Sequence, residues 1–327
     1  MKLPHRRQFL HLAAGAAALP AASSLAWALD YPTRPVHLIV GFGPGGTADI
    51  VARLTGQWLS EHLGQPFIVE DRPGAGSNIA TEAVVHSPPD GYTLLLVSTP
   101  QAINATLYEK LNFKFDRDIA PVASVFRDSP AVMEVNPAFP AKTVPEFIAY
   151  AKANPNKISM ASAGIGSVNH VYGELFKVTT GVNMLHVPYR STTAPLTDLI
   201  GGQVQVTFDA LGSSIEYIRT GKLRALAVTS TTRVEALPDI PTIAEFVPGY
   251  EATGFMGIVA PKNTPPEIIA RLNKEINAGL ADPKIKSTIA GLGYTVSQSS
   301  PADFGKLIAD QTEKWAKVIR AANIKVE

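Results

Sequence analysis

Along most of its length the chain alternates short apolar runs with longer segments in which apolar residues recur every three or four positions. Short apolar runs predict buried β-strands, and the periodic segments predict amphipathic helices. In the first third, strands are predicted at 36–42, 67–71 and 93–99, with helices at 47–63 and 77–87. Such alternation is typical of an α/β fold with a mostly parallel sheet.

The alternation stops at 120–136, a long extended segment, and then begins again. Further strands are predicted at 158–163, 183–189, 204–211 and 223–230, and further helices at 143–154, 167–180, 193–202 and 213–221. A strand at 254–261 precedes the amphipathic segments 266–282 and 301–322. We expect two α/β domains with a ligand cleft between them, each a mostly parallel sheet flanked by helices. Domain 1 is expected at 29–127 and 252–327 and domain 2 at 128–251, with the two chain crossings forming a hinge.

The first 28 residues differ in composition from the rest of the chain. A basic segment (2–7) precedes an Ala-rich apolar stretch (10–25), and the small residues of Ala-Trp-Ala (26–28) suit a cleavage site. This pattern predicts a signal peptide at 1–28, which is too short to span a membrane as a helix. The pair Arg6-Arg7 favours twin-arginine export, and an ordinary Sec signal with two arginines is the alternative.

Composition narrows the class further. The chain has no cysteine, which excludes disulfides, thiolate metal sites and a lipoprotein anchor. Removing the three basic residues of the signal from the 29 leaves 26 against 28 acidic residues, a net charge of −2. Neither a basic stripe nor a second apolar run of about 18 residues stands out. We therefore expect a soluble, periplasmic, unanchored protein with no nucleic-acid partner.

Three glycine-rich turns each join a predicted strand to the start of a predicted helix, at 41–47, 76–78 and 164–170. The first N–H groups of a helix carry partial positive charge and lack partners, and glycine lets the backbone approach an anion closely. These turns lie at the carboxyl ends of strands, where open α/β sheets bind ligands. One such turn alone is ordinary scaffold. Related turns in both domains support a clamp for a carboxylate.

The spacing of Gly41, Gly43 and Gly46 also matches the G-x-G-x-x-G of dinucleotide-binding folds, with Glu70-Asp71 near the position of a ribose-binding acid. Pro44 and the predicted export argue against a nicotinamide cofactor. An exported oxidoreductase using this loop is the alternative function. The sequence has no P-loop, H-E-x-x-H or G-x-S-x-G motif, and its histidines show no short metal-ligand spacing. We therefore expect no enzyme activity, no cofactor and no metal.

Several segments resemble the Bug family of periplasmic solute receptors, which is related to tripartite tricarboxylate transporters. They are YPTRPVHLIVGFGPGGTADIVAR, EDRPGAGSNIATEAVVHSPPDGYTLLLVST, GIGSVNHVYGELF, MLHVPYR, APLTDLIGGQVQVTFDAL and YIRTGKLRALAVTSTTRVEALPDIPTIAE. The resemblance covers 31–327 and implies a type II-like Venus-flytrap binding protein. It implies capture of a small organic acid, a di- or tricarboxylate or an aromatic carboxylate, for uptake by a tripartite-type membrane permease. We expect a monomer.

In the family, backbone N–H groups, hydroxyls and water in the cleft loops hold the carboxylate. The matching positions in the first domain are Gly45, Gly46, Thr47, Asp49, Ser77, Asn78, Ser98 and Thr99. Those in the second domain are Ser167, Asn169, His170, Tyr189, Arg190 and Asp209.

Some of these positions have alternative interpretations. An acid at Asp49 would repel a carboxylate, so we interpret it as an organiser of its loop or a partner for a ligand hydroxyl or amine. A capping or packing role is the alternative for His170, and a solvated loop position for Arg190. Ser77 and Ser191 replace glycines that are usual in the family, and the segment 98–101 is shorter than usual. The identity of the ligand is therefore not predicted.

Overall fold

The computed structural model describes residues 30–189, 191 and 193–326, so the predicted signal peptide and Arg190 lie outside the described residues. Pro32–Glu327 forms one compact unit. Its first strands and helices are β1 (Val36–Val40), α1 (Thr47–Leu63), β2 (Phe67–Asp71), α2 (Asn78–Val85), β3 (Thr93–Ser98), α3 (Thr99–Leu107) and the long β4 (Ile119–Val135), with a 3-10 turn at Ala75–Ser77. The strands and helices predicted in this part are present.

Helix α3 is an addition to the predicted elements. Its sequence, TPQAINATL, has no clear apolar period, and β-branched residues lower its helix propensity. The helix is started by a capping box in which Ser98 and Gln101 bond reciprocally, with a proline in the first turn.

The remaining elements follow the predicted order. They are α4 (Val144–Ala153), β5 (Ser159–Ser162), α5 (Val168–Thr180), β6 (Leu185–Pro188), α6 (Ala194–Ile200), β7 (Val206–Ala210), α7 (Leu211–Arg219), β8 (Arg224–Val228), a 3-10 turn at Ile243–Glu245, β9 (Thr253–Pro261), α8 (Pro266–Ala281), α9 (Pro283–Gly291) and α10 (Pro301–Ala321). None of the helices in the described part of the chain is long and apolar enough to cross a membrane.

The strands form a mixed sheet in the order β2-β1-β3-β9-β4-β7-β5-β6, with β8 also paired to β4. The pairs β1–β2, β1–β3, β5–β6 and β5–β7 are parallel. Each antiparallel pair involves β4 or β9. The predicted parallel βα units are therefore present, and the two long strands that join them make the sheet mixed.

Strand β4 changes partners partway along its length. Its first part, Ile119 to Pro130, pairs with β9, and the part from Ala131 to Val135 pairs with β7 and β8. We call β1–β3 and β9 with α1–α3 the first lobe, and β5–β8 with α4–α7 the second lobe. Strand β4 therefore contributes to both lobes.

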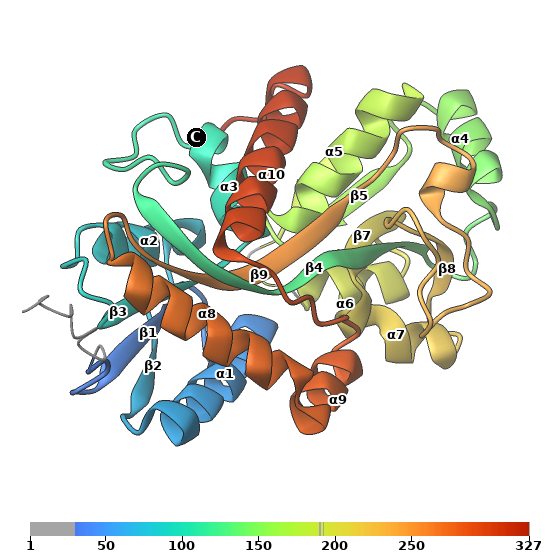
Figure 1. Ribbon diagram of the computed structural model, residues 1–327. Coiled ribbons are helices and arrows are strands. Elements are labelled where there is room, and N and C mark those ends of the chain that lie inside the picture. Colours follow the sequence, from blue (N-terminus) through green and yellow to red (C-terminus); the bar gives the residue numbers. More distant parts are fainter. Residues whose placement is uncertain (1–29, 190, 192, 327) are drawn as a thin grey trace, which may run out of the picture. The chain divides into compact units, whose positions relative to one another are not determined.

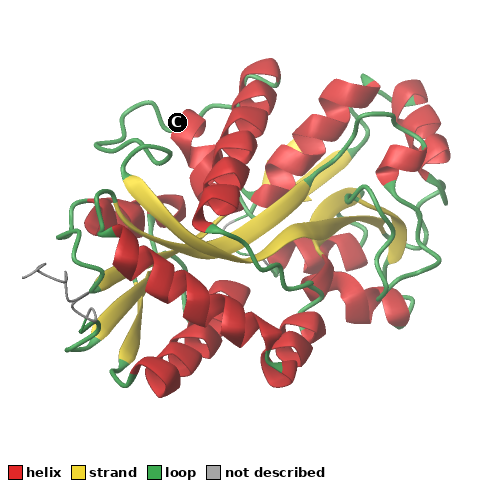
Figure 2. Ribbon diagram, in the orientation of Figure 1, coloured by secondary structure: helices red, strands yellow, loops and turns green. Residues whose placement is uncertain are grey.

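Helices cover both faces of the sheet (Figures 1 and 2). On one face, α10 packs against α3 of the first lobe and α5 of the second. On the other, α1 packs against α8. The main apolar core is continuous through both lobes, from Ile39 in β1 to Ile319 in α10. The turns at the carboxyl ends of the strands are thus attached to one packed scaffold.

Candidate functional site

The turn before α1 presents an uncapped helix N-terminus. The N-cap residue, Gly46, provides no side-chain hydrogen bond to the first turn. The Gly45 N–H donates to Asp49 Oδ2 at 2.8 Å, and Asp49 Oδ1 pairs with Arg53 Nε at 2.6 Å. The buried carboxylate of Asp49 is therefore engaged within its own loop. The first N–H groups of α1, at Thr47 and after it, have no partner inside the helix and suit an anion.

The second turn packs directly against the first. Ser77 is fully buried at a φ of 78° and accepts a hydrogen bond from Gln101 Nε2 at 2.8 Å. A Cβ atom on Gly41 would lie 1.7 Å from Ser77 Oγ, so only glycine fits there. Gln101 Oε1 in turn accepts from the Ser98 N–H at 3.0 Å. The ends of β1 and β3 and the start of α2 thus form one polar network.

Asn78 and Thr99 complete the first-lobe positions. Asn78 Oδ1 accepts from Asn104 Nδ2 at 3.1 Å, whereas Asn78 Nδ2 is buried with no partner among the described residues. It is a donor available to a ligand. Thr99 Oγ1 accepts from the Phe255 N–H at 3.0 Å, so this hydroxyl fixes β9 to the start of α3.

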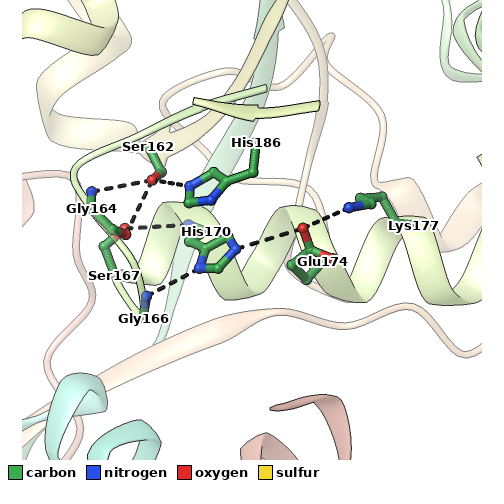
Figure 3. Close-up of polar contacts among 8 residues, drawn as sticks. All are labelled: Ser162, Gly164, Gly166, Ser167, His170, Glu174, Lys177 and His186. Carbon is green, nitrogen blue, oxygen red and sulfur yellow. Dashed lines mark hydrogen bonds and ion pairs between the residues drawn. The ribbon is translucent and has the colours of Figure 1, made fainter. Parts of the chain in front are cut away.

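In the second lobe, the turn before α5 is held by its own side chains (Figure 3). Ser167 caps α5 by accepting from the His170 N–H at 3.4 Å. The Gly166 N–H donates to His170 Nδ1 at 3.0 Å, which assigns the proton of the neutral ring to Nε2. His170 Nε2 faces Glu174 Oε1 at 3.6 Å. Each of these contacts is internal to the turn and to α5.

A second histidine lies beside His170. The two rings, His170 and His186, stack with centroids 3.6 Å apart, and His186 Nε2 is 2.6 Å from Ser162 Oγ (Figure 3). Burial, and then the neighbouring His170, lower the pKa of His186 to about 4, so its ring is neutral near pH 7. Ser162 is fully buried, and Glu174 pairs with Lys177 at 2.8 Å as well as facing His170. The Ser162–His186 pair joins the end of β5 to β6.

Asn169 and Asp209 join the start of α5 to the end of β7. Asn169 Nδ2 donates to Asp209 Oδ1 at 2.5 Å, and Asp209 is only 6% exposed. Burial raises the pKa of Asp209 to about 6, opposed by the Asn169 hydrogen bond. Its second oxygen, Oδ2, has no hydrogen-bond partner within the described ranges. Asp209 is thus a buried acid with one oxygen hydrogen-bonded to Asn169.

Tyr189 and Arg190 follow β6. The Tyr189 hydroxyl donates to Asp198 Oδ2 at 2.5 Å, which ties the loop to α6. Burial and this acid raise the pKa of Tyr189 to about 12. Arg190 lies outside the described residues.

One contact joins the two lobes, and an aromatic stack joins the segment after α9 to β4. A Cβ atom on Gly166 would lie 2.1 Å from Leu107 Cδ2, so the second-lobe turn touches the end of α3. Tyr294, in the segment between α9 and α10, stacks on Phe126 of β4 at 4.5 Å. Burial and the charge of Asp209 raise the pKa of Tyr294, and a hydrogen bond with Thr47 opposes them. The pKa of Tyr294 is thus affected by groups of both lobes. Sequence reasoning missed Tyr294, because its position depends on a long-range contact and it belongs to no strand-to-helix turn.

Two cavities of the described chain stand out. One of about 880 Å³ lies beside the Arg127–Pro130 part of β4, and its other lining segments are 230–236, 251–253 and 290–297. Tyr294 lines it, and none of the residues predicted from the sequence does. The other, of about 220 Å³, is lined by His170, Glu174, Lys177 and His186 together with 322–325. No cluster of His, Asp or Glu arranged to hold a metal occurs in the part of the chain described by the structure.

The fold defines a class, the two-domain periplasmic binding proteins. BugD has this fold and superposes with a TM-score of 0.78 at 35% identity, covering 91% of this chain and 100% of BugD. The sequence matches the tripartite tricarboxylate transporter family receptor over residues 51–324, and the chain belongs to that family. The resemblance to the Bug proteins is thereby confirmed.

Individual relatives agree with this assignment. The protein BugT of Bordetella pertussis is 37% identical over 300 residues, covering 91% of this chain and 92% of BugT. A R. palustris structure with adipate has a TM-score of 0.80 and 36% identity, covering 90% of this chain and 99% of that one. MatC from Rhodopseudomonas palustris, with bound malate, has a TM-score of 0.77 and 31% identity. The match covers 88% of this chain and 100% of MatC.

Proposed function

We propose that this protein is an exported periplasmic receptor that captures a small organic acid between its two lobes and performs no chemistry on it. The observation that carries the proposal is the uncapped N-terminus of α1, which follows β1 and whose first N–H groups have no partner inside the helix. Family membership and the dicarboxylates in two neighbouring structures support it.

The ligand class follows from the groups that lack partners. The first N–H groups of α1 and Asn78 Nδ2 are donors for one carboxylate. Asp209 Oδ2 is an acceptor for a second polar group of the ligand. We propose a di- or tricarboxylate, with an aromatic carboxylate as the other candidate. Gly45, Gly46, Thr47, Ser98, Ser167, Asn169 and His170 form the walls of this site.

Hinge closure is part of the proposal. We place domain 1 at 29–127 and 252–327 and domain 2 at 128–251. The change of partner strand between Pro130 and Ala131 supports this division, as does the pairing of Pro130 with Thr253 at the second crossing. A ligand that contacts turns of both lobes would favour the closed form by its differential affinity.

Export and delivery complete the proposed role. The signal sequence predicted at 1–28 would carry the chain to the periplasm, by the twin-arginine or the Sec route. The receptor would work there as a monomer and deliver its ligand to a tripartite tricarboxylate-type permease, as the family description supports.

A panel of organic acids tests the function by thermal shift and calorimetry. A ligand present at about 100 times its Kd adds about 2.7 kcal/mol of stability, and we expect adipate, malate, citrate or benzoate to give such a shift. Gly46→Val should abolish the shift, because its side chain enters the space before α1. Gly43→Val is the matched control, since a Cβ atom there meets nothing within 4 Å. No shift with any acid would refute the proposal. Flavin or nicotinamide absorbance in the purified protein would favour an exported oxidoreductase instead.

A further inference from the structure

We propose that Glu134, Ser214 and Asp209 form a proton-linked unit in the second lobe, which decides whether the cleft presents an anionic acceptor or a neutral donor to the ligand. This inference rests on the proposed function, because Asp209 is one of the proposed ligand-binding residues. It concerns how that site selects among acids.

The pairing of β4 with β7 brings the three residues together. Val132 lies opposite Asp209 and Glu134 lies opposite Thr207, so both acids project from the same face of the sheet. Ser214, on the first turns of α7, covers that face and donates to Glu134 Oε1 at 2.7 Å. Ser214 also opposes the rise in the pKa of Asp209. The two acids are therefore diagonal neighbours on one buried face of the sheet, with Ser214 bonded to Glu134.

Both acids are buried with an unused oxygen. Glu134 and Ser214 are 0% exposed, and neither Glu134 Oε2 nor Asp209 Oδ2 has a partner among the residues the structure describes. An ionised carboxylate in such a place is costly unless a cation or several donors surround it. The cation on the neighbouring strand, Arg224, instead donates to the carbonyl oxygens of Phe139 and Ala141. Glu134 therefore holds its proton at neutral pH.

The titration behaviour of the two acids agrees with this geometry. Burial, followed by the charge of Asp209, raises the pKa of Glu134 well above its usual range, with Ser214 opposing. Burial raises the pKa of Asp209 to about 6, opposed by Asn169, the Ala210 N–H and Ser214. Asp209 is thus the member of the unit that exchanges a proton near neutral pH.

We attribute this proton exchange to the unit of Glu134, Ser214 and Asp209 and not to its neighbours. Asn169 of α5 donates to Asp209, Ser214 of α7 opposes the rise in its pKa, and its charge raises the pKa of Tyr294 in the segment after α9. In the first lobe, the charge of Asp49 is paired with Arg53. The Ser214 hydroxyl has one hydrogen, which it can give to only one acid at a time. It donates to Glu134, and the charge of Asp209 raises the pKa of Glu134, so the titrations of the two acids are coupled.

The consequence is a choice of ligand that depends on pH. Above about pH 6, ionised Asp209 accepts from a ligand hydroxyl or ammonium group and repels a second carboxylate. Below that pH, protonated Asp209 donates to a carboxylate. Adipate, which offers only carboxylates, should bind more tightly as pH falls, by up to about tenfold per pH unit for one linked proton. Malate, which has a hydroxyl for Asp209, should depend less on pH.

A first experiment needs no ligand. Carboxyl ¹³C chemical shifts of the ligand-free protein are followed with pH, and Asp209→Asn and Glu134→Gln identify the two resonances. We expect the Asp209 carboxyl to titrate near pH 6 and the Glu134 carboxyl to stay protonated at pH 7. Ser214→Ala should shift both midpoints. Midpoints near the usual values of about 4 for both acids, or no effect of Ser214→Ala, would overturn the inference even if the protein binds organic acids.

A second experiment measures how many protons the protein takes up when it binds adipate. Calorimetry of adipate binding in two buffers of different ionisation enthalpy reports the protons taken up. The wild type should take up close to one proton just above the pH at which Asp209 titrates, and Asp209→Asn should take up none. Equal uptake in both proteins would overturn the inference. Failure of adipate and malate to bind at all would count against the proposed function, and the carboxyl titration would still decide the state of the unit.

Discussion

Asp209 makes the folded state sensitive to pH through one side chain. Its pKa is about 6 in the folded protein against 3.8 for the free group. Between these values the native state keeps a proton that the unfolded chain has lost. The contribution of Asp209 to stability is therefore complete below about pH 4 and is lost as pH rises to about 6, a change of roughly 3 kcal/mol.

Asp209→Asn should remove this pH-dependent contribution to stability. Urea unfolding at pH values below and above this window is the measurement. Relative to the wild type, we expect the variant to gain up to roughly 3 kcal/mol in its free energy of unfolding as pH rises through the window. Differences that stay constant with pH would show that Asp209 titrates normally. Asn169→Ala removes the donor to Asp209 and should raise the pKa of this acid further. The pH range over which stability is lost should then extend to higher pH.

At the same scale, residue types and spacing located only part of the site. Helix-start patterns pointed to Ser167, which caps α5. Asn169 and Asp209 were carried over from the family resemblance, and their hydrogen bond is a finding of the structure. Tyr294 and Glu134 had no sequence pattern to mark them. Their roles depend on contacts with residues far away in the chain.

At the scale of elements, the turn between β5 and α5 is fitted closely to α3. Gly166 has a φ of 76°, and a Cβ atom there would meet Leu107 Cδ2 at 2.1 Å. Gly181, at the other end of α5, has a φ of 69° and nothing within 4 Å. Gly181→Ala should therefore lower the free energy of unfolding by only about 1 kcal/mol, because only the strain of a positive φ opposes it. Gly166→Ala should cost about 1–3 kcal/mol more, because the turn is overpacked.

Denaturant unfolding of the two variants measures this difference, and the double variant identifies its source. Adding Leu107→Ala to Gly166→Ala should recover part of the overpacking cost relative to the sum of the single variants, because it removes the opposing methyl groups. Equal costs for the two glycine variants would indicate that the turn and α3 separate readily in solution.

For the whole molecule, α10 acts as a common support. It packs on α3 of the first lobe and α5 of the second. Its Trp315 is fully buried and stacks on Tyr172 of α5 with ring centroids 5.1 Å apart. Trp315→Ala should lower the free energy of unfolding by about 3–5 kcal/mol. The loss should appear in both lobes.

Calorimetric unfolding checks this expectation. Lys317→Ala on the same helix is the control, because the Lys317–Glu313 pair is largely exposed and should contribute little. A Trp315→Ala protein as stable as the control would mean that α10 is only loosely attached to the sheet.

The sequence by itself determined the alternation of strands and helices, the glycine turns before α1 and α5, and the long strand β4. These features depend on side chains within one turn or one strand, so local periodicity is enough to predict them. Only the tertiary structure decided that β9 lies between β3 and β4, that α3 is a helix, and that Tyr294 stacks on Phe126. The same holds for the burial of Glu134 beside Ser214. Strand register and burial arise from contacts between residues far apart in the chain, and no local pattern records them.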